Sequence, residues 1–289
     1  MSVRKAVIPV AGFATRFLPA CKSVPKCMLT IVDKPIIQYL VDEAVAAGIE
    51  EILLVVGRKK EVIEDYFSED KELEDFLVER GKESFLPLVT NMSGKAKIHF
   101  IEEEGGAKGL GHAILMAKDF VGNEPFAIMY GDVIMQGEKP CIKEMIEQYE
   151  KLGASVIGVE KVEWKDVPKY GNVSGEEISD RLYKVEKMQE KPKVEETKSN
   201  LAISDRHVVL PEIFGFLEKT KPGKGGEIQV TDAYNSMVNT KEGVYAYDYK
   251  ATRFDSGDKL GFVKASIDET LRRPELRDDL ISFIKSLDI

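Results

Sequence analysis

The sequence predicts an α/β fold of the Rossmann-like, three-layer kind, with a mostly parallel central sheet and helices on both faces. Strand-like and helix-like segments alternate along the chain, which is the pattern of a parallel sheet connected by helices. The segment 51–57 is a continuous apolar run of the kind that is buried on both faces. A chain of 289 residues, 43% of them hydrophobic, can bury the substantial core that such a fold needs.

The first strand is expected at 4–10, where an apolar run ends in the tight turn Ala11-Gly12. Small residues at such a turn let backbone N–H groups approach an anion closely. Two cations follow, Arg16 and Lys26. The pattern indicates a cradle for nucleotide phosphates, although its spacing matches neither the dinucleotide fingerprint nor the P-loop. A plain turn followed by solvated cations is the alternative.

A helix is expected next, opened by Pro35 and closed by Gly48. Its apolar face consists of Ile36, Ile37, Leu40, Val41, Ala44 and Val45. The strand at 51–57 follows directly, so strand, helix and strand form a right-handed crossover. The charged segment 65–97 predicts a solvated or interface helix without chemistry of its own.

A further strand end is expected at Gly131-Asp132, after the apolar run 126–130. Because ligands bind at the carboxyl ends of strands in such sheets, Gly12 and Asp132 are expected to meet at that edge.

The last third of the chain has two recognisable segments. Charge is dense over 160–205, and alternation at 182–188 suggests strands, so this segment is predicted to be an insertion rather than a separate domain. The stretch 273–289, with Pro274 near its start, predicts an amphipathic helix that docks or makes a subunit contact.

The composition narrows the class of protein. A net charge of −9 argues against nonspecific nucleic-acid binding, which needs a basic surface. Cys21, Cys27 and Cys141 form no C-x-x-C pair, so neither a disulfide framework nor a zinc knuckle is suggested and a reducing cytoplasm is favoured. The N-terminus lacks a signal-peptide core, and no apolar run is long enough to span a membrane.

Several sequence blocks resemble, in order, those of bacterial UTP–glucose-1-phosphate uridylyltransferases, within the sugar-nucleotide nucleotidyltransferase family. The blocks are 12–20, 25–29, 31–35, 108–113, 131–132, 190–192, 199–203, 225–233 and 254–261. Each block alone is a weak signal, but so many in the family's order are hard to reach by chance. The resemblance therefore covers nearly the whole chain.

The resemblance implies one nucleotidyltransferase domain over 1–289, with a nucleotide-binding half at about 1–135 and a sugar-binding and C-terminal half at about 136–289. It implies Mg²⁺-dependent transfer of a uridylyl group from UTP to glucose 1-phosphate, giving UDP-glucose and pyrophosphate. The sugar phosphate is itself the nucleophile, so the protein mainly positions two anions and stabilises their charge. A homodimer or homotetramer is also implied, with the insertion at 160–205 binding the sugar.

The resemblance also assigns site residues. It gives catalytic roles to Arg16, Lys26, Asp132 and Lys191. It places the nucleotide on Ala11, Gly12, Ala14, Thr15, Arg16, Lys26, Glu104 and Gly109, the sugar phosphate on Gly171, Glu190, Lys191 and Asn200, and Mg²⁺ on Asp132 and Asp255, hard oxygen ligands of the kind that Mg²⁺ takes. Plain alternatives stay open: a turn for Asp132, a helix cap for Asp255 and a surface ion pair for Glu190 and Lys191.

Three positions depart from the family pattern. Ala14 replaces Gly, which is tolerable unless the position needs a positive φ, and Cys27 replaces Glu and is expected to be a packed thiol. Glu104 replaces a Gln that reads the uracil edge, although the run 102–104 leaves that alignment uncertain by one place. An ionised Glu can only accept hydrogen bonds, so base recognition is altered if Glu104 touches the base; a solvated acidic loop is the alternative.

These departures leave two other functions open. One is a regulatory paralogue that keeps the fold but has lost efficient nucleotide chemistry. The other is an enzyme with a changed base or sugar, such as one that uses dTTP. His112 is expected to be a structural histidine.

Overall fold

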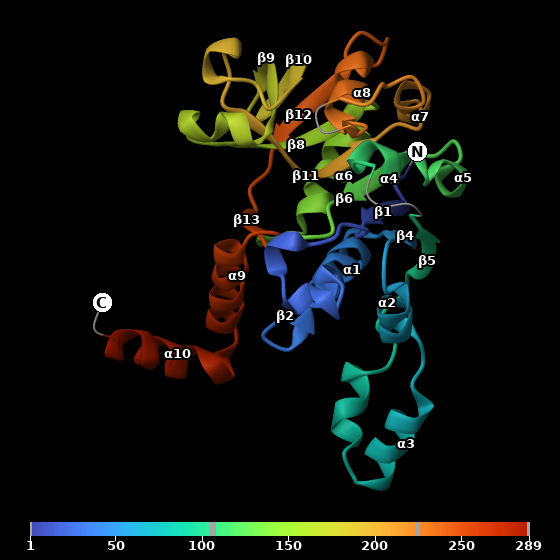
Figure 1. Ribbon diagram of the computed structural model, residues 1–289, viewed down its shortest axis with the longest axis vertical. Coiled ribbons are helices and arrows are strands. Elements are labelled where there is room, and N and C mark those ends of the chain that lie inside the picture. The colour runs from blue at the N-terminus through green and yellow to red at the C-terminus, as the bar shows by residue number, and fades with distance from the viewer. Residues whose placement is uncertain (1, 104–107, 224–225, 288–289) are drawn as a thin grey trace.

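One mixed sheet runs through the protein in the computed structural model, which describes residues 2–103, 108–223 and 226–287 (Figure 1). In these residues it has nine strands, in the order β5-β4-β1-β6-β11-β8-β12-β10-β9. In chain order they are β1 (Lys5–Pro9), β4 (Glu51–Val56), β5 (Lys97–Glu102), β6 (Phe126–Met129), β8 (Ser155–Lys161), β9 (Gly171–Ser179), β10 (Leu182–Glu190), β11 (Leu201–Val209) and β12 (Val244–Asp248).

The half of the sheet formed by β5, β4, β1 and β6 is parallel, as the sequence predicts. Helix α1 (Ile36–Ala47) connects β1 to β4, with Pro35 at its N-cap and Gly48 in the left-handed conformation, φ 95°, at its C-cap. Glycine adopts that conformation without a steric penalty. The predicted strand–helix–strand unit is confirmed.

The other half of the sheet corrects the prediction of a mostly parallel, Rossmann-like sheet. Strand β11 is antiparallel to β6 and β8, β8 is parallel to β12, and β10 is antiparallel to β12 and β9. Strand β9 then pairs with β11, so five strands close into a mixed barrel. Closure removes exposed edges, and the predicted insertion is part of this barrel. The α/β class itself is confirmed.

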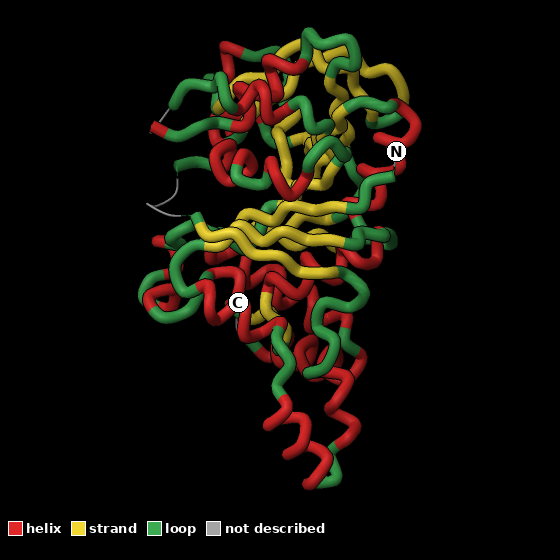
Figure 2. The backbone as a smooth tube through the Cα atoms, turned by 90° about the vertical axis from the view of Figure 1, so that its right-hand side faces the viewer, coloured by secondary structure: helices red, strands yellow, loops and turns green. Residues whose placement is uncertain are grey.

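Helices cover both faces of the sheet (Figure 2). Alternate residues of β1 point to opposite faces, with Ala6 and Ile8 in one buried cluster and Val7 in the other. The first cluster includes α1 and α6, and the second includes α4, α5, α7 and α8. These helices are α4 (Leu110–Leu115), α5 (Lys118–Val121), α6 (Cys141–Leu152), α7 (Ile213–Leu217) and α8 (Val230–Met237).

Two helical extensions project from the sheet (Figure 1). One contains α2 (Lys60–Phe67), α3 (Lys71–Glu79) and the short 3-10 helix η4 (Glu83–Leu88), and it confirms the helical, largely exposed character predicted for 65–97. The other contains α9 (Lys259–Arg272) and α10 (Pro274–Ser286), the latter opened by the predicted proline. Among the described residues, no helix is both long and apolar enough to cross a membrane.

The remaining elements are short. Two small antiparallel pairs join β2 (Thr30–Ile31) to β3 (Lys34–Pro35) and β7 (Val133–Gln136) to β13 (Thr252–Asp255). Further 3-10 turns are η1 (Thr15–Phe17), η2 (Ala20–Lys22), η3 (Lys26–Met28), η5 (Trp164–Lys169) and η6 (Val194–Glu196). The β7–β13 pair brings the C-terminal part of the chain to the end of β6, where the candidate site lies.

Candidate active site

The carboxyl end of β1 is approached closely by the chain at two glycines, Gly131 after β6 and Gly57 after β4. A side-chain carbon on Gly131 would lie 2.5 Å from the carbonyl oxygen of Pro9, and one on Gly57 would lie 2.7 Å from that of Ala11. A cavity of about 270 Å³ opens at this edge, and both Gly12 and Asp132 line it. The predicted meeting of these two residues is confirmed.

We call this cavity the first cavity, and it brings together the loop after β1, the start of α4 and Asp132, which follows β6. Ala11, Gly12 and Lys26 come from the loop after β1, and Gly109 and Leu110 from the start of α4. Gly109 has φ 100°, and a side-chain carbon there would lie 2.9 Å from the backbone nitrogen of Ile228, so no other residue type fits without displacement. The backbone of these glycine-containing segments and the ammonium of Lys26 thus face a cavity large enough for a ligand.

Lys26 and Asp132 form an ion pair across this cavity. Their side chains are 20% and 35% exposed. A pair in this partly desolvated setting is stronger than one on the open surface. Each group nevertheless keeps a route to a ligand in the cavity.

Asp255 approaches Asp132 from β13, on which it lies opposite Val133. A side-chain carbon on Gly257 would lie 2.5 Å from Oδ2 of Asp132 and 2.9 Å from Oδ1 of Asp255, so oxygens of both carboxylates face the same point. Burial raises the pKa of Asp255, the Arg253 guanidinium lowers it, and the negative charge of Asp132 raises it further. This mutual repulsion is the setting in which a cation stabilises both carboxylates.

The two carboxylates beside Gly257 suit Mg²⁺ better than a metal ion whose ligands are all protein side chains. In the part of the chain that the structure describes, no group of three or more His, Cys, Asp or Glu side chains could hold a metal. Mg²⁺ commonly takes one or two carboxylates and completes its shell with phosphate oxygens and water. Ser256, which follows Asp255 in this loop, is fully buried, and its hydroxyl has no hydrogen-bond partner among the described residues.

The loop after β1 is tied to the same place. Arg16 donates from Nη1 to the carbonyl oxygen of Gly257 at 3.2 Å. Ala14 precedes η1, which begins at Thr15, and it has φ 51° and ψ 41°, in the left-handed region. The departure from glycine at Ala14 therefore falls on a position that does need a positive φ, at a cost of about 1 kcal/mol.

A second cavity of about 250 Å³ is lined by Gly171, Glu190 and Lys191. Glu190 accepts a hydrogen bond from Thr231 Oγ1 at 2.7 Å through one oxygen, and its other oxygen lies 3.1 Å from Nζ of Lys191. Leu110 lines both cavities, so they adjoin. The structure thus brings three of the four predicted sugar-phosphate residues together next to the first cavity.

Asn200 stands apart from those three residues. Its side-chain amide donates to the carbonyl oxygen of Val162 at 2.8 Å, which ties the start of β11 to the end of β8. It does not line either of the two cavities. Its described contact is therefore structural.

Glu104 lies outside the described residues. Its neighbour Glu103 is 7% exposed and lines the first cavity, and its Oε1 lies 2.8 Å from Nδ1 of His112.

Cys27 is 2% exposed, and burial raises the pKa of its thiol to about 12. The expectation of a packed thiol at Cys27 is confirmed, and its burial disfavours the thiolate form at neutral pH.

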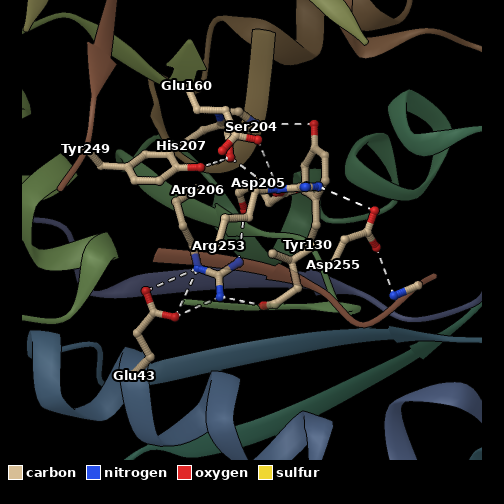
Figure 3. Close-up of polar contacts among 12 residues, drawn as sticks. Glu43, Tyr130, Glu160, Ser204, Asp205, Arg206, His207, Tyr249, Arg253 and Asp255 are labelled. Carbon is tan, nitrogen blue, oxygen red and sulfur yellow. Dashed lines mark hydrogen bonds and ion pairs between the residues drawn. The ribbon is translucent and has the colours of Figure 1, made fainter. Parts of the chain in front are cut away.

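Sequence reasoning missed several polar residues beside the second cavity. Arg253, Asp205 and Tyr130 line it, and Thr231 holds Glu190 in place. The side chains of Arg253, Asp205 and Tyr130 are drawn in Figure 3. Arg253 stands immediately before the block 254–261 that carried the family resemblance, and Thr231 lies inside the block 225–233. No spacing rule points to Asp205, because its partner is 48 residues away in the chain.

The chain is similar to known proteins over most of its length. A family model described as nucleotidyl transferase matches residues 5–270. The chain belongs to the nucleotidyl transferase family. Within it, the chain is 49% identical over 287 residues to UTP–glucose-1-phosphate uridylyltransferase of Staphylococcus epidermidis, covering 99% of both chains. The resemblance read from the sequence blocks is confirmed, and the chain falls among the bacterial members of that uridylyltransferase branch.

Solved structures of nucleotidyl transferases have the same fold. A UTP-bound UDP-glucose pyrophosphorylase of Acinetobacter baumannii is 37% identical, with a TM-score of 0.90 over 99% of this chain and 100% of that one. A UDP-glucose pyrophosphorylase complexed with UDP-glucose is 38% identical, with a TM-score of 0.84 over 94% of this chain and 100% of that one. The mixed sheet and its barrel are therefore shared with nucleotidyl transferases that bind UTP and UDP-glucose.

Proposed function

We propose that this protein transfers a uridylyl group from UTP to glucose 1-phosphate, forming UDP-glucose and releasing pyrophosphate. The observation that carries this proposal is the convergence of Lys26, Asp132 and Asp255 at the first cavity, of which Lys26 and Asp132 are lining residues and which adjoins the second cavity at Leu110. A reaction between two anionic substrates needs cations and a metal site between their binding places.

The first cavity is proposed to take UTP. Its backbone turn and the ammonium of Lys26 suit a triphosphate, because N–H groups and positive charges stabilise phosphate oxygens. The proposed nucleotide contacts in the described part of the chain are Ala11, Gly12, Ala14, Thr15, Arg16, Lys26 and Gly109. Glu104 remains a proposed contact on the strength of the sequence alone.

The second cavity is proposed to take glucose 1-phosphate. Glu190 can accept hydrogen bonds from sugar hydroxyls while Thr231 fixes its orientation, and Lys191 offers an ammonium for the phosphate. Gly171 leaves room there, since a side-chain carbon would lie 3.3 Å from Glu190 Oε2. Asn200 is proposed to support this half of the site through β11.

The chemical step is an in-line displacement. An oxygen of the sugar phosphate attacks the α-phosphorus of UTP, a new P–O bond forms, the bond to the β-phosphate oxygen breaks, and pyrophosphate leaves with that electron pair. Asp132 and Asp255 would hold Mg²⁺, which neutralises phosphate charge when bound. Arg16 and Lys26 stabilise the departing pyrophosphate, and Lys191 orients the attacking phosphate.

The organisation of the chain is also part of the proposal. Residues 1–135 would bind the nucleotide and 136–289 the sugar, within a single domain joined by the continuous sheet. Exposed apolar residues on α9 and α10, among them Val263 and Phe283, support assembly into a homodimer or homotetramer. Three unpaired cysteines support a reducing, cytoplasmic setting.

The test is pyrophosphate release by purified protein with glucose 1-phosphate and Mg²⁺, comparing UTP, dTTP, CTP, ATP and GTP. Turnover dominated by UTP is expected. Preference for another nucleotide would change the base that we assign to the substrate but not the proposed nucleotidyl transfer. Silence with all five would favour the regulatory paralogue, which should still bind UDP-glucose.

A further inference from the structure

The guanidinium of Arg253 lies among three carboxylates (Figure 3). It pairs with Asp205 through Nε, and its Nη2 donates to the other oxygen of Asp205 at 3.4 Å. Nη2 also lies 3.7 Å from Oδ2 of Asp255, and Nε lies 3.7 Å from Oε1 of Glu160. The Arg253 side chain is only 14% exposed, so these contacts are formed with little water between them.

Asp205 anchors this arrangement to the sheet. It lies on β11, its carboxylate also accepts from Ser204 Oγ at 3.1 Å, and its carbonyl oxygen accepts from the backbone N–H of Tyr130 at 3.0 Å. Tyr130 is two residues before Asp132. One residue of the sheet is thus linked to both carboxylates of the proposed metal site, to Asp132 through the backbone and to Asp255 through Arg253.

We propose that Arg253 is a positioning residue that holds the Asp255 carboxylate opposite Asp132 and so sets the affinity of this pair for a divalent cation. This inference rests on the proposed function, because it assumes that the two carboxylates bind Mg²⁺. Outer partners of metal-ligating side chains commonly change metal affinity by roughly ten- to a hundredfold when they are removed.

The charges around Arg253 favour positioning over direct contact with a substrate phosphate. One guanidinium faces three carboxylates, so its positive charge is already compensated. Its guanidinium carbon also lies over the ring of Tyr170, 6.0 Å from the ring centre. Because Arg253 lines the second cavity, direct contact with glucose 1-phosphate is the competing role that the experiment must exclude.

The experiment measures Mn²⁺ binding by electron paramagnetic resonance, with saturating UDP-glucose and no pyrophosphate, so that no turnover occurs. The variants are Arg253→Gln, which loses the charge, and Arg253→Lys, which keeps the charge but loses the planar fork. The control is Arg181→Gln. Arg181 is also a bridging arginine, with Nη2 3.2 Å from Asp248, but it has no described contact to either metal carboxylate.

Mn²⁺ affinity is expected to fall roughly ten- to a hundredfold in Arg253→Gln, less in Arg253→Lys, and not at all in Arg181→Gln. The dissociation constant for UDP-glucose should stay within a few-fold of wild type in all three. Melting curves identify any variant that is not folded, in which case Arg253→Lys carries the test.

Two results would overturn the inference while leaving the proposed function intact. Wild-type Mn²⁺ affinity in both folded Arg253 variants would show that Arg253 does not set it. Weaker UDP-glucose binding with unchanged Mn²⁺ affinity would make Arg253 a substrate ligand. A wild-type protein that binds neither Mn²⁺ nor UDP-glucose would instead overturn the proposed function itself.

Discussion

The ammonium of Lys26 pairs with the carboxylate of Asp132, although 106 positions separate them in the chain. Without ligand, each neutralises the other inside the first cavity. A triphosphate that attracts Lys26 would therefore release Asp132 toward Mg²⁺. Such an exchange of partners would couple nucleotide binding to metal binding.

Lys26→Met tests that coupling. Losing a charge-assisted contact to phosphate should raise KM for UTP by roughly ten- to a hundredfold. The free Asp132 should then bind Mn²⁺ more tightly in the absence of nucleotide, as measured by calorimetry. Lys22→Met is the control, because Lys22 is exposed in the same loop. Weaker Mn²⁺ binding in Lys26→Met would show that Lys26 assists the metal instead of competing with it.

Ala14→Gly should stabilise the protein by about 0.5–1 kcal/mol, because glycine adopts the left-handed conformation of this position without the steric penalty of a methyl group, less its larger loss of backbone entropy. Urea denaturation measures the difference. Ala20→Gly, in η2 and without a positive φ, should destabilise by up to about 1 kcal/mol. Equal effects at the two positions would contradict the account of Ala14.

Glu43→Ala should destabilise the protein by about 3–5 kcal/mol. Arg206 is fully buried and contacts both oxygens of Glu43, at 2.7–3.1 Å, so removing the carboxylate leaves a buried charge unpaired. Glu147→Ala, which breaks the exposed pair with Lys139, should cost less than about 1 kcal/mol. Chemical denaturation measures the loss in free energy of unfolding for both variants. A small loss for Glu43→Ala would mean that Arg206 finds another partner.

His207 should make the protein acid-sensitive. Its ring is fully buried, and burial together with the charge of Arg206 lowers its pKa to about 3. The unfolded chain takes up a proton near pH 6.5 while the folded protein does not, so stability is complete above that pH and falls by roughly 1.4 kcal/mol per unit as the pH decreases toward 3. His207→Gln should show a shallower acid slope in urea denaturation between pH 6 and 4. Equal slopes would place the acid sensitivity elsewhere.

The parallel half of the sheet was predictable because its signals are local. The apolar run 51–57 and the helix between Pro35 and Gly48 follow from composition and capping residues, which the structure reproduces. The barrel was not predictable, because it depends on β9 returning to β11, and such long-range pairing leaves only period-2 alternation in the sequence. That alternation identifies strands without their order.

The site was predictable to a similar degree. The loop after β1 contains Gly12 and Lys26, and Asp132 follows β6. Parallel strands bring the residues at their carboxyl ends together. Arg253 and Asp205 were not found, because their role depends on a contact between β13 and β11 that no sequence spacing encodes. The sequence could not predict the left-handed conformation of Ala14, because the neighbouring residues do not determine the sign of φ. It predicted only that alanine would be unfavourable there if φ were positive.

The most direct test of the central claim is pyrophosphate release from UTP and glucose 1-phosphate by wild type and by Asp132→Asn, at saturating Mg²⁺. The substitution keeps the shape of the side chain but removes the charge that faces Asp255 and Lys26. We expect rapid release by wild type and a loss of at least roughly a hundredfold in a variant that melts like wild type. Undiminished, Mg²⁺-dependent release by Asp132→Asn would contradict the assignment of this site.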